Sequence, residues 1–109
     1  MKDCKRHSTS EKELGQQVED LFKLFGWRFY HVLEQYHYAK RTSKGFPDYV
    51  ATRQGNDGIG RLLFIELKNE KGLVTEAQRA WLIDLSECPG IEVYLWRPAD
   101  WDEILLTLR

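Results

Sequence analysis

The residues with the clearest chemical potential are Glu66 and Lys68, which stand two positions apart after the apolar run 62–65. In a β-strand, residues two apart point to the same face, so this carboxylate and this ammonium emerge side by side. Apolar side chains fill both faces of the strand before them, which is typical of a central strand covered on both sides. Charged groups at the end of such a strand are costly unless they are paired or hold a metal ion.

Asp48 is predicted to lie directly opposite Glu66. It opens a second apolar strand, 48–52, and the segment 53–60 between the two strands is rich in turn-forming Gly, Asn and Asp. A hairpin folded about Asp57 places Asp48 across from Glu66, with Cβ atoms about 5 Å apart. Two carboxylates at that separation repel each other unless a cation lies between them. The hairpin therefore predicts a metal site.

Short motifs surround these residues along nearly the whole chain. They are Gly26-Trp27, Tyr30-His31, Gly45-Phe46-Pro47-Asp48, Glu66-Leu67-Lys68, Thr75 with Gln78 and Trp81, and Trp96-Arg97-Pro98. In this order the set resembles the VRR-NUC (virus-type replication-repair nuclease) family of the PD-(D/E)XK nuclease superfamily, in its stand-alone phage and bacterial form. The resemblance covers residues 10–109, without a large insertion.

The resemblance implies a metal-dependent deoxyribonuclease that hydrolyses phosphodiester bonds. Its catalytic residues would be Glu11, Asp48, Glu66, Lys68 and Gln78. Mg²⁺ or Mn²⁺ would be held by oxygen ligands from Asp48, Glu66, the Leu67 carbonyl and, directly or through water, Glu11. Lys68 would orient the attacking water and stabilise charge that grows on the phosphate. The structural alternative is a buried Asp–Lys–Glu ion-pair network, which stabilises poorly unless every group is satisfied.

The small family members suggest that the substrate is a Holliday (four-way) junction, resolved by a homodimer. Two symmetric nicks on opposed strands need two active sites, which a twofold dimer supplies. Tyr36, Tyr38 and the last helix are the expected contact, because aromatic residues are enriched at interfaces. The alternatives are a flap or duplex-end nuclease of the same fold and a catalytically silent DNA-binding module. A different metal-dependent phosphohydrolase that acts on nucleotides is disfavoured, because the sequence shows no glycine-rich phosphate loop of the P-loop type.

The composition is that of one ordinary domain. A chain of 109 residues, 42% apolar and 30% charged, is large enough for one core but not for two. No stretch approaches the roughly 20 apolar residues of a membrane span, and no signal-peptide pattern opens the chain. The two cysteines, Cys4 and Cys88, suggest neither a disulfide framework nor a cysteine-rich zinc site. We therefore expect a cytoplasmic protein of a bacterial or phage-infected cell.

The net charge of −1 does not by itself indicate a nucleic-acid binder, so the local distribution of charge matters more. A basic group directly before the Gly-Phe-Pro-Asp motif is interleaved with aromatic residues, a composition suited to phosphate contact and base packing. Its expected DNA-binding residues are Lys40, Arg41, Ser43 and Lys44. An exposed loop kept soluble by its charges is the alternative.

The apolar pattern predicts an α/β fold with a restriction-endonuclease-like core, a central mixed sheet flanked by helices in the order α-β-β-β-α-β-α. Residues 1–9 are expected to be flexible, and residues 10–109 to form a single nuclease domain. Helices are predicted over 10–25, over 75–87 and from Asp100 onward, and strands over 27–33, 48–52, 61–68 and 91–96. Capping boxes begin the first two helices, and the helical crossover makes the fourth strand, largely buried, parallel to the third.

Helical periodicity decides which glutamate of the first helix is the better site candidate. At about 100° per residue, Glu11 projects beside the apolar stripe, whereas Glu19 projects more toward solvent. Placement in the first turn, where the helix dipole favours an acidic residue, is the alternative reading of Glu11. Gly15, which weakens a helix by about 1 kcal/mol, is expected to leave room for a close neighbour.

Two readings of Gln78 stay open. As the fourth residue of a capping box it can bond back to Thr75, and in the family the glutamine of this helix lies near the active site. On the same helix, Trp81, Leu82 and Leu85 stand at helical spacing and are expected to be core residues.

Overall fold

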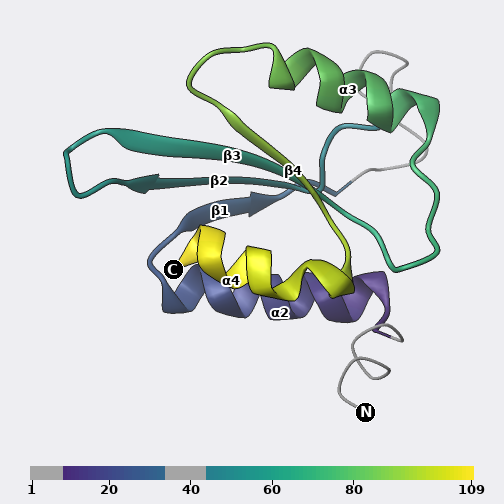
Figure 1. Ribbon diagram of the computed structural model, residues 1–109, viewed down its shortest axis with the longest axis horizontal. Coiled ribbons are helices and arrows are strands. Elements are labelled where there is room, and N and C mark those ends of the chain that lie inside the picture. The colour runs from purple at the N-terminus through teal and green to yellow at the C-terminus, as the bar shows by residue number, and fades with distance from the viewer. Residues whose placement is uncertain (1–8, 34–43) are drawn as a thin grey trace.

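The computed structural model describes residues 9–33 and 44–109, and these form an α/β fold built on a four-stranded mixed sheet (Figure 1). The strands are β1 (Arg28–His31), β2 (Tyr49–Gln54), β3 (Gly60–Leu67) and β4 (Glu92–Trp96). The helices are α2 (Glu11–Leu24), α3 (Glu76–Ser86) and α4 (Trp101–Leu108), with a 3-10 turn over Pro98–Asp100. The predicted fold class and element order are confirmed, and the arrangement is consistent with a restriction-endonuclease-like core.

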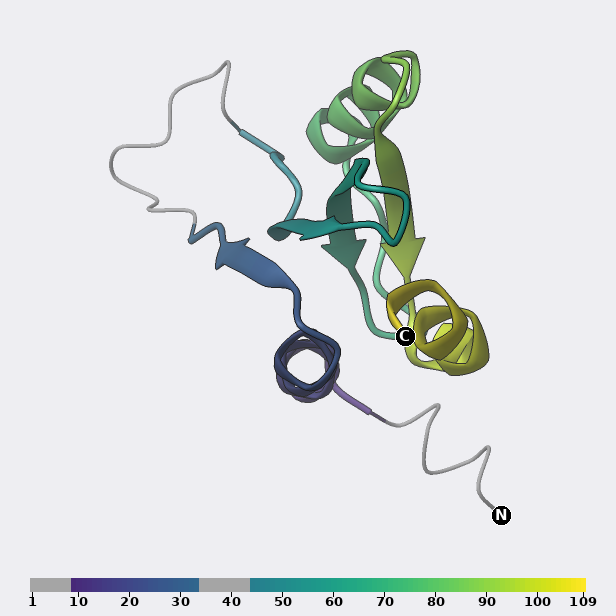
Figure 2. The ribbon, with the colours of Figure 1, turned by 90° about the vertical axis from the view of Figure 1, so that its left-hand side faces the viewer.

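Helices cover the sheet from both sides. Helices α2 and α4 lie next to each other on one face, and α3 lies on the opposite face, beside β4 (Figures 1 and 2). The strands follow the order β1-β2-β3-β4, so β3 is a central strand, as expected. The last three residues of β3 are all buried, and the strand ends there among both layers of helices.

The hairpin between β2 and β3 has the predicted register. Tyr49 pairs with Ile65, and the antiparallel ladder continues to Gln54 opposite Gly60. At the turn, the Asp57 carboxylate accepts the Ile59 N–H at 2.9 Å. Strand β4 pairs with β3 in parallel, as the helical crossover predicts.

Both predicted capping boxes are present. The Ser10 hydroxyl accepts the Glu13 N–H at 3.0 Å, and the Glu13 carboxylate accepts the Ser10 N–H at 2.9 Å. Thr75 and Gln78 make the same reciprocal pair at the start of α3. Helix α2 ends at Leu24, and Gly26 follows with a φ of +80°, a conformation that glycine adopts without steric cost.

The core lies between the sheet and the pair α2 and α4. It gathers apolar side chains from alternate strand positions and from the inward faces of these helices: Leu14, Val18, Leu21, Phe22, Trp27, Tyr49, Ala51, Leu63, Ile65, Leu67, Trp96, Ile104 and Leu108. Two side chains tie the helix ends together. The Trp27 Nε1–H donates to the Leu108 carbonyl at 2.8 Å, and Arg53 Nη1 donates to the carbonyls of Phe25 and Leu108 at 3.0 and 2.8 Å.

Burial of α3 and β4 was overestimated from the sequence. Trp81, Leu82 and Leu85 are half-buried rather than core residues, and α3 contains no buried residue. In β4 only Trp96 is buried. The physical reason is position: α3 packs on the sheet without a second helix beside it in the described part of the chain, and β4 is an edge strand.

Asp100 does not cap α4 with its side chain. Its carboxylate instead accepts the Arg97 N–H at 2.8 Å, because a 3-10 turn precedes the helix and presents that earlier donor. Within the described residues, no helix has the length and apolar character needed to cross a membrane.

Candidate active site

Asp48 lies at the end of the hairpin, one position before β2 begins. The ladder from Tyr49 to Gln54 extrapolates to Asp48 opposite Glu66, as predicted. One oxygen of its carboxylate, Oδ2, accepts the backbone N–H of Leu67 at 2.8 Å. This hydrogen bond fixes the aspartate across the last residues of β3, because a charged acceptor makes a short and directional bond.

Glu66 carries a carboxylate inside the protein. The residue is only 2% exposed, and Gln78 Nε2 donates to its Oε2 at 2.9 Å. The Lys68 ammonium lies 4.0 Å from the same oxygen, and the Lys68 side chain is 12% exposed. A buried carboxylate is costly without such partners. The 4.0 Å distance confirms the predicted position of Lys68 beside Glu66.

Gln78 completes the capping box and also contacts a second partner, Glu66. Its backbone N–H and its side-chain oxygen complete the capping box with Thr75, at 3.1 and 3.0 Å. Its side-chain Nε2 donates to the Glu66 carboxylate. A glutamine carries both an acceptor and two donors at its tip, which is why one side chain can satisfy a helix end and orient a buried acid.

Glu11 belongs to the same electrostatic environment. Burial raises the pKa of the Glu11 carboxyl above its usual value, the charge of Asp48 raises that pKa further, and Lys68 opposes the shift. Glu11, Asp48 and Leu67 all line one cleft of about 380 Å³ between α2 and the ends of β2 and β3. The structure therefore brings the first-helix glutamate to the strand ends, as expected.

The expectation that Glu19 faces solvent was wrong. Its carboxylate accepts a hydrogen bond from the buried Tyr49 hydroxyl and lies 3.6 Å from His31 Nδ1. Gly15 makes this contact possible, since a Cβ there would lie 3.3 Å from the Tyr49 oxygen. Gly15 thus leaves room for a close neighbour, as predicted. The helical projection failed for Glu19 because it described α2 alone, without the tyrosine that reaches toward it from the sheet.

Residues 45–47, which directly precede Asp48, pack against α3. The Phe46 ring meets the rings of Trp81 and Phe64 edge-on, with centroids 4.8 and 5.9 Å apart, and Pro47 is buried. Gly45, at φ +83°, lies so close to α3 that an added Cβ would be 2.6 Å from the Ala77 and Gln78 backbone. The helix that bears Gln78 and the loop that bears Asp48 are therefore packed together.

Arg97 holds the loop that follows Lys68, a role that the sequence did not reveal. Its Nη1 donates to the carbonyls of Asn69 and Gly72 at 2.7 and 2.8 Å, and to that of Glu70 at 3.3 Å. The Lys68 N–H itself donates to the Trp96 carbonyl at 3.0 Å. The Trp-Arg-Pro motif thus fixes the backbone on which the lysine stands.

A comparison with family models decides the affiliation. The model of the VRR-NUC domain matches residues 5–99 of this 109-residue chain. The chain belongs to the VRR-NUC domain family. Comparison with curated proteins and with solved structures gave no match.

A VRR-NUC domain is a nuclease-type domain whose substrate is DNA, and nuclease domains of this kind generally use divalent metals. Across residues 9–33 and 44–109, no three His, Cys, Asp or Glu side chains converge as a ligand set. The set expected from the sequence contains three carboxylates, those of Glu11, Asp48 and Glu66, and these do not converge as such a group here; the Leu67 carbonyl is its fourth donor. All of its donors are oxygens, which is the chemistry that Mg²⁺ and Mn²⁺ select in proteins.

Part of the expected DNA contact lies outside the described residues. Lys40, Arg41 and Ser43 fall there, as do Tyr36 and Tyr38 of the expected dimer contact. Lys44 is described and exposed, directly before Gly45. It therefore lies next to the segment that carries the VRR-NUC domain's Asp48.

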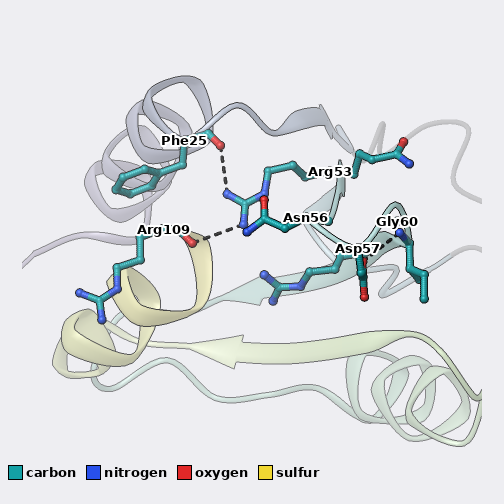
Figure 3. A pocket seen from close by; sticks show the side chains of 10 residues that line it. Phe25, Arg53, Asn56, Asp57, Gly60 and Arg109 are labelled. Carbon is teal, nitrogen blue, oxygen red and sulfur yellow. Dashed lines mark hydrogen bonds between the residues drawn. The ribbon is translucent and has the colours of Figure 1, made fainter.

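A second pocket, of about 750 Å³, lies at the far end of the sheet from these residues (Figure 3). Arg53, Arg61 and Arg109 are among its lining residues, which gives it a basic character. Arg53 donates to the Phe25 carbonyl at 3.0 Å and to the Arg109 carbonyl at 3.3 Å, and Arg61 forms a bidentate pair with Glu92 at 2.7 Å. Arg53 satisfies carbonyls at the ends of helices and Arg61 pairs with an acid, so we assign the pocket a structural role in the VRR-NUC domain.

Proposed function

We propose that the protein is a divalent-metal-dependent DNA endonuclease that resolves four-way junctions as a homodimer. The observation that carries this proposal is the grouping at the ends of β2 and β3. Asp48, Glu66 and Lys68 meet there, and Glu11 lies across the adjoining cleft. Two acids and a lysine held at adjacent strand ends are poor stabilising elements but suitable groups for phosphodiester hydrolysis.

Asp48, Glu66, the Leu67 carbonyl and Glu11 would hold Mg²⁺ or Mn²⁺. A bound divalent ion supplies Lewis-acid chemistry, since it withdraws charge from a phosphate and makes nearby water more acidic. Burial and then the charge of Asp48 raise the pKa of Glu11, and the part due to Asp48 supports this reading because carboxylates that repel each other gain most from a cation.

The remaining work falls to side chains of the protein. Lys68, the cation beside Glu66, would orient the attacking water and stabilise negative charge that develops on the phosphate. Gln78 would keep the Glu66 carboxylate in a single orientation through its 2.9 Å hydrogen bond. Both side chains are held by their neighbours before substrate arrives, which is the condition under which such groups accelerate a reaction.

Chelation of divalent metal is expected to abolish cleavage of DNA. The protein, freed of metal with EDTA, should leave a labelled four-way junction intact, and added Mg²⁺ or Mn²⁺ should restore cutting. Gel electrophoresis of the end-labelled strands measures this. Undiminished cleavage by thoroughly chelated protein would exclude the proposed mechanism.

The protein in solution is expected to have twice the mass of one chain and to cut a mobile junction by paired nicks across it. One domain of this size supplies one active site, and twofold symmetry matches the symmetry of the two nicks. The last helix, on which Leu106 is 64% exposed, is the contact surface that we propose. Light scattering tests the mass of the dimer, and mapping of the nicks tests whether they are paired across the junction. A monomer that cuts only flaps or duplex ends would reject the junction assignment and favour a flap or duplex-end nuclease.

A further inference from the structure

The cleft beside Asp48 is lined by residues of α2 and β1 as well, and three of them are hydrogen-bond donors that accompany the carboxylates of Glu11 and Glu19. Lys12 and Gln16 come from α2, and His31 comes from the end of β1. Lys12 and Gln16 stand four residues apart, so they lie on the same side of the helix, one turn after the other. Both are exposed. The donors thus share one cleft with Glu11 and Asp48.

The floor of this cleft is closed by a partly buried pair. Tyr49, 2% exposed, donates its hydroxyl hydrogen to the Glu19 carboxylate, and Gly15 leaves the space in which they meet. Burial and then the Glu19 carboxylate raise the pKa of Tyr49, so the hydroxyl stays protonated and remains a donor. The Glu19 carboxylate is therefore occupied by a hydrogen bond at the floor of the cleft.

His31 lies on this floor in a defined orientation. Its ring stacks on the Tyr49 ring with centroids 4.5 Å apart and planes 15° apart, and its Nδ1 is 3.6 Å from the Glu19 carboxylate. The side chain is 44% exposed. The two nitrogens of an imidazole lie on different edges of the ring, so a histidine oriented through Nδ1 offers Nε2 to a ligand.

We propose that this cleft binds backbone phosphates of the DNA strand next to the scissile phosphate, through Lys12, Gln16 and His31. The assignment rests on the proposed nuclease function and extends it to the path of the strand. Lysine, glutamine and histidine are donors to phosphate oxygens, and such contacts position a strand without reading its sequence.

The lining of the cleft favours phosphates over bases. Base binding uses exposed aromatic faces as stacking platforms. Tyr49 is the aromatic ring of the cleft wall besides His31, and it is buried beneath the imidazole. A second cation beside Glu19 is disfavoured, because the Glu19 carboxylate already accepts the Tyr49 hydroxyl.

Fluorescence anisotropy with a short labelled DNA duplex in EDTA tests the assignment without cleavage. Lys12→Ala is expected to weaken binding about tenfold at low salt and to reduce the slope of log K against log[salt] by about one phosphate contact. His31→Phe keeps a ring on Tyr49 but removes both nitrogens, and should weaken binding by about threefold to tenfold with little change in slope. Lys23→Ala is the matched control, an exposed lysine of α2 that does not line the cleft, and should leave both quantities unchanged.

A series of four-way junctions with one neutral methylphosphonate each locates the contact, because the branch point fixes where the protein binds. Wild-type protein should lose affinity at one position next to the cleavage site, and Lys12→Ala should lose none there. Equal effects of Lys12→Ala and Lys23→Ala, full binding by His31→Phe, or no DNA binding by wild-type protein would overturn the assignment. The two proposals fail separately. If the variants show these binding losses but wild-type protein never cuts DNA with Mg²⁺, the cleft assignment stands and the nuclease function is rejected. If the variants bind normally and wild-type protein cuts DNA, the nuclease function stands and the cleft assignment is rejected.

Discussion

Lys68→Ala is expected to reduce DNA cleavage about 10³-fold while leaving Mn²⁺ binding intact. The ammonium lies 4.0 Å from Glu66, where it can stabilise charge on a phosphate but cannot ligate a cation. Its removal takes away a positive charge that repels a bound metal ion, so the affinity for Mn²⁺ should be unchanged or higher. Cleavage rates and calorimetric titration with Mn²⁺ measure the two properties in the same protein preparation.

Asp48→Ala and Glu66→Ala are the comparison, since each should lose metal binding and cleavage together. Asp48→Asn is the sharper control. The amide keeps an oxygen that can accept the Leu67 N–H, now held at 2.8 Å, but it removes the charge. It should therefore fold normally and still fail to bind Mn²⁺. Loss of Mn²⁺ binding in Lys68→Ala as severe as that in Asp48→Ala would remove the role assigned to the lysine.

Gly45→Ala is expected to lower the free energy of unfolding by about 3 kcal/mol. Two costs combine at this position. The backbone has φ +83°, which an L side chain rarely adopts, and the added Cβ would lie 2.6 Å from the backbone of α3. Relief of that clash would push α3 away from the loop and move Gln78 with it. Cleavage should therefore fall as well, and urea unfolding gives the loss of stability.

Gly58→Ala separates the two costs. Gly58 has a φ of +81° but no atom within 4 Å of the position of a Cβ, so it bears the conformational cost alone. We expect a loss of about 1 kcal/mol for this variant. If both variants lost the same stability in urea, the close approach of Gly45 to α3 would contribute nothing.

Much of the candidate site follows from rules that act over a few residues. Alternation along a strand placed Glu66 and Lys68 on one face, and turn chemistry around Asp57 set the register that brings Asp48 opposite Glu66. Capping-box spacing located the starts of α2 and α3 to the residue. In each case the interacting residues are neighbours in sequence or across one hairpin, so the sequence pattern alone predicts the structure.

The remaining features depend on which elements meet in space. Glu19 was misplaced because its partner, Tyr49, comes from β2 and was read as an apolar strand residue. The three carbonyls bound by Arg97 belong to a loop more than twenty residues earlier in the chain. Trp81 has the spacing of a core residue, yet its burial depends on how many elements cover α3. Periodicity reports the side of a helix that is apolar, but not how completely that side is covered.

The bonds that join α2 to α4 also set an order for biosynthesis. Trp27 and its acceptor Leu108 are 81 residues apart in sequence. At about 5–20 residues per second, a ribosome needs about 4–16 s to make the chain between them. During that interval α2 can pack on the sheet but lacks its neighbouring helix on the same face. A growing chain of this protein should therefore leave the side of α2 that meets α4 exposed to chaperones until α4 has emerged.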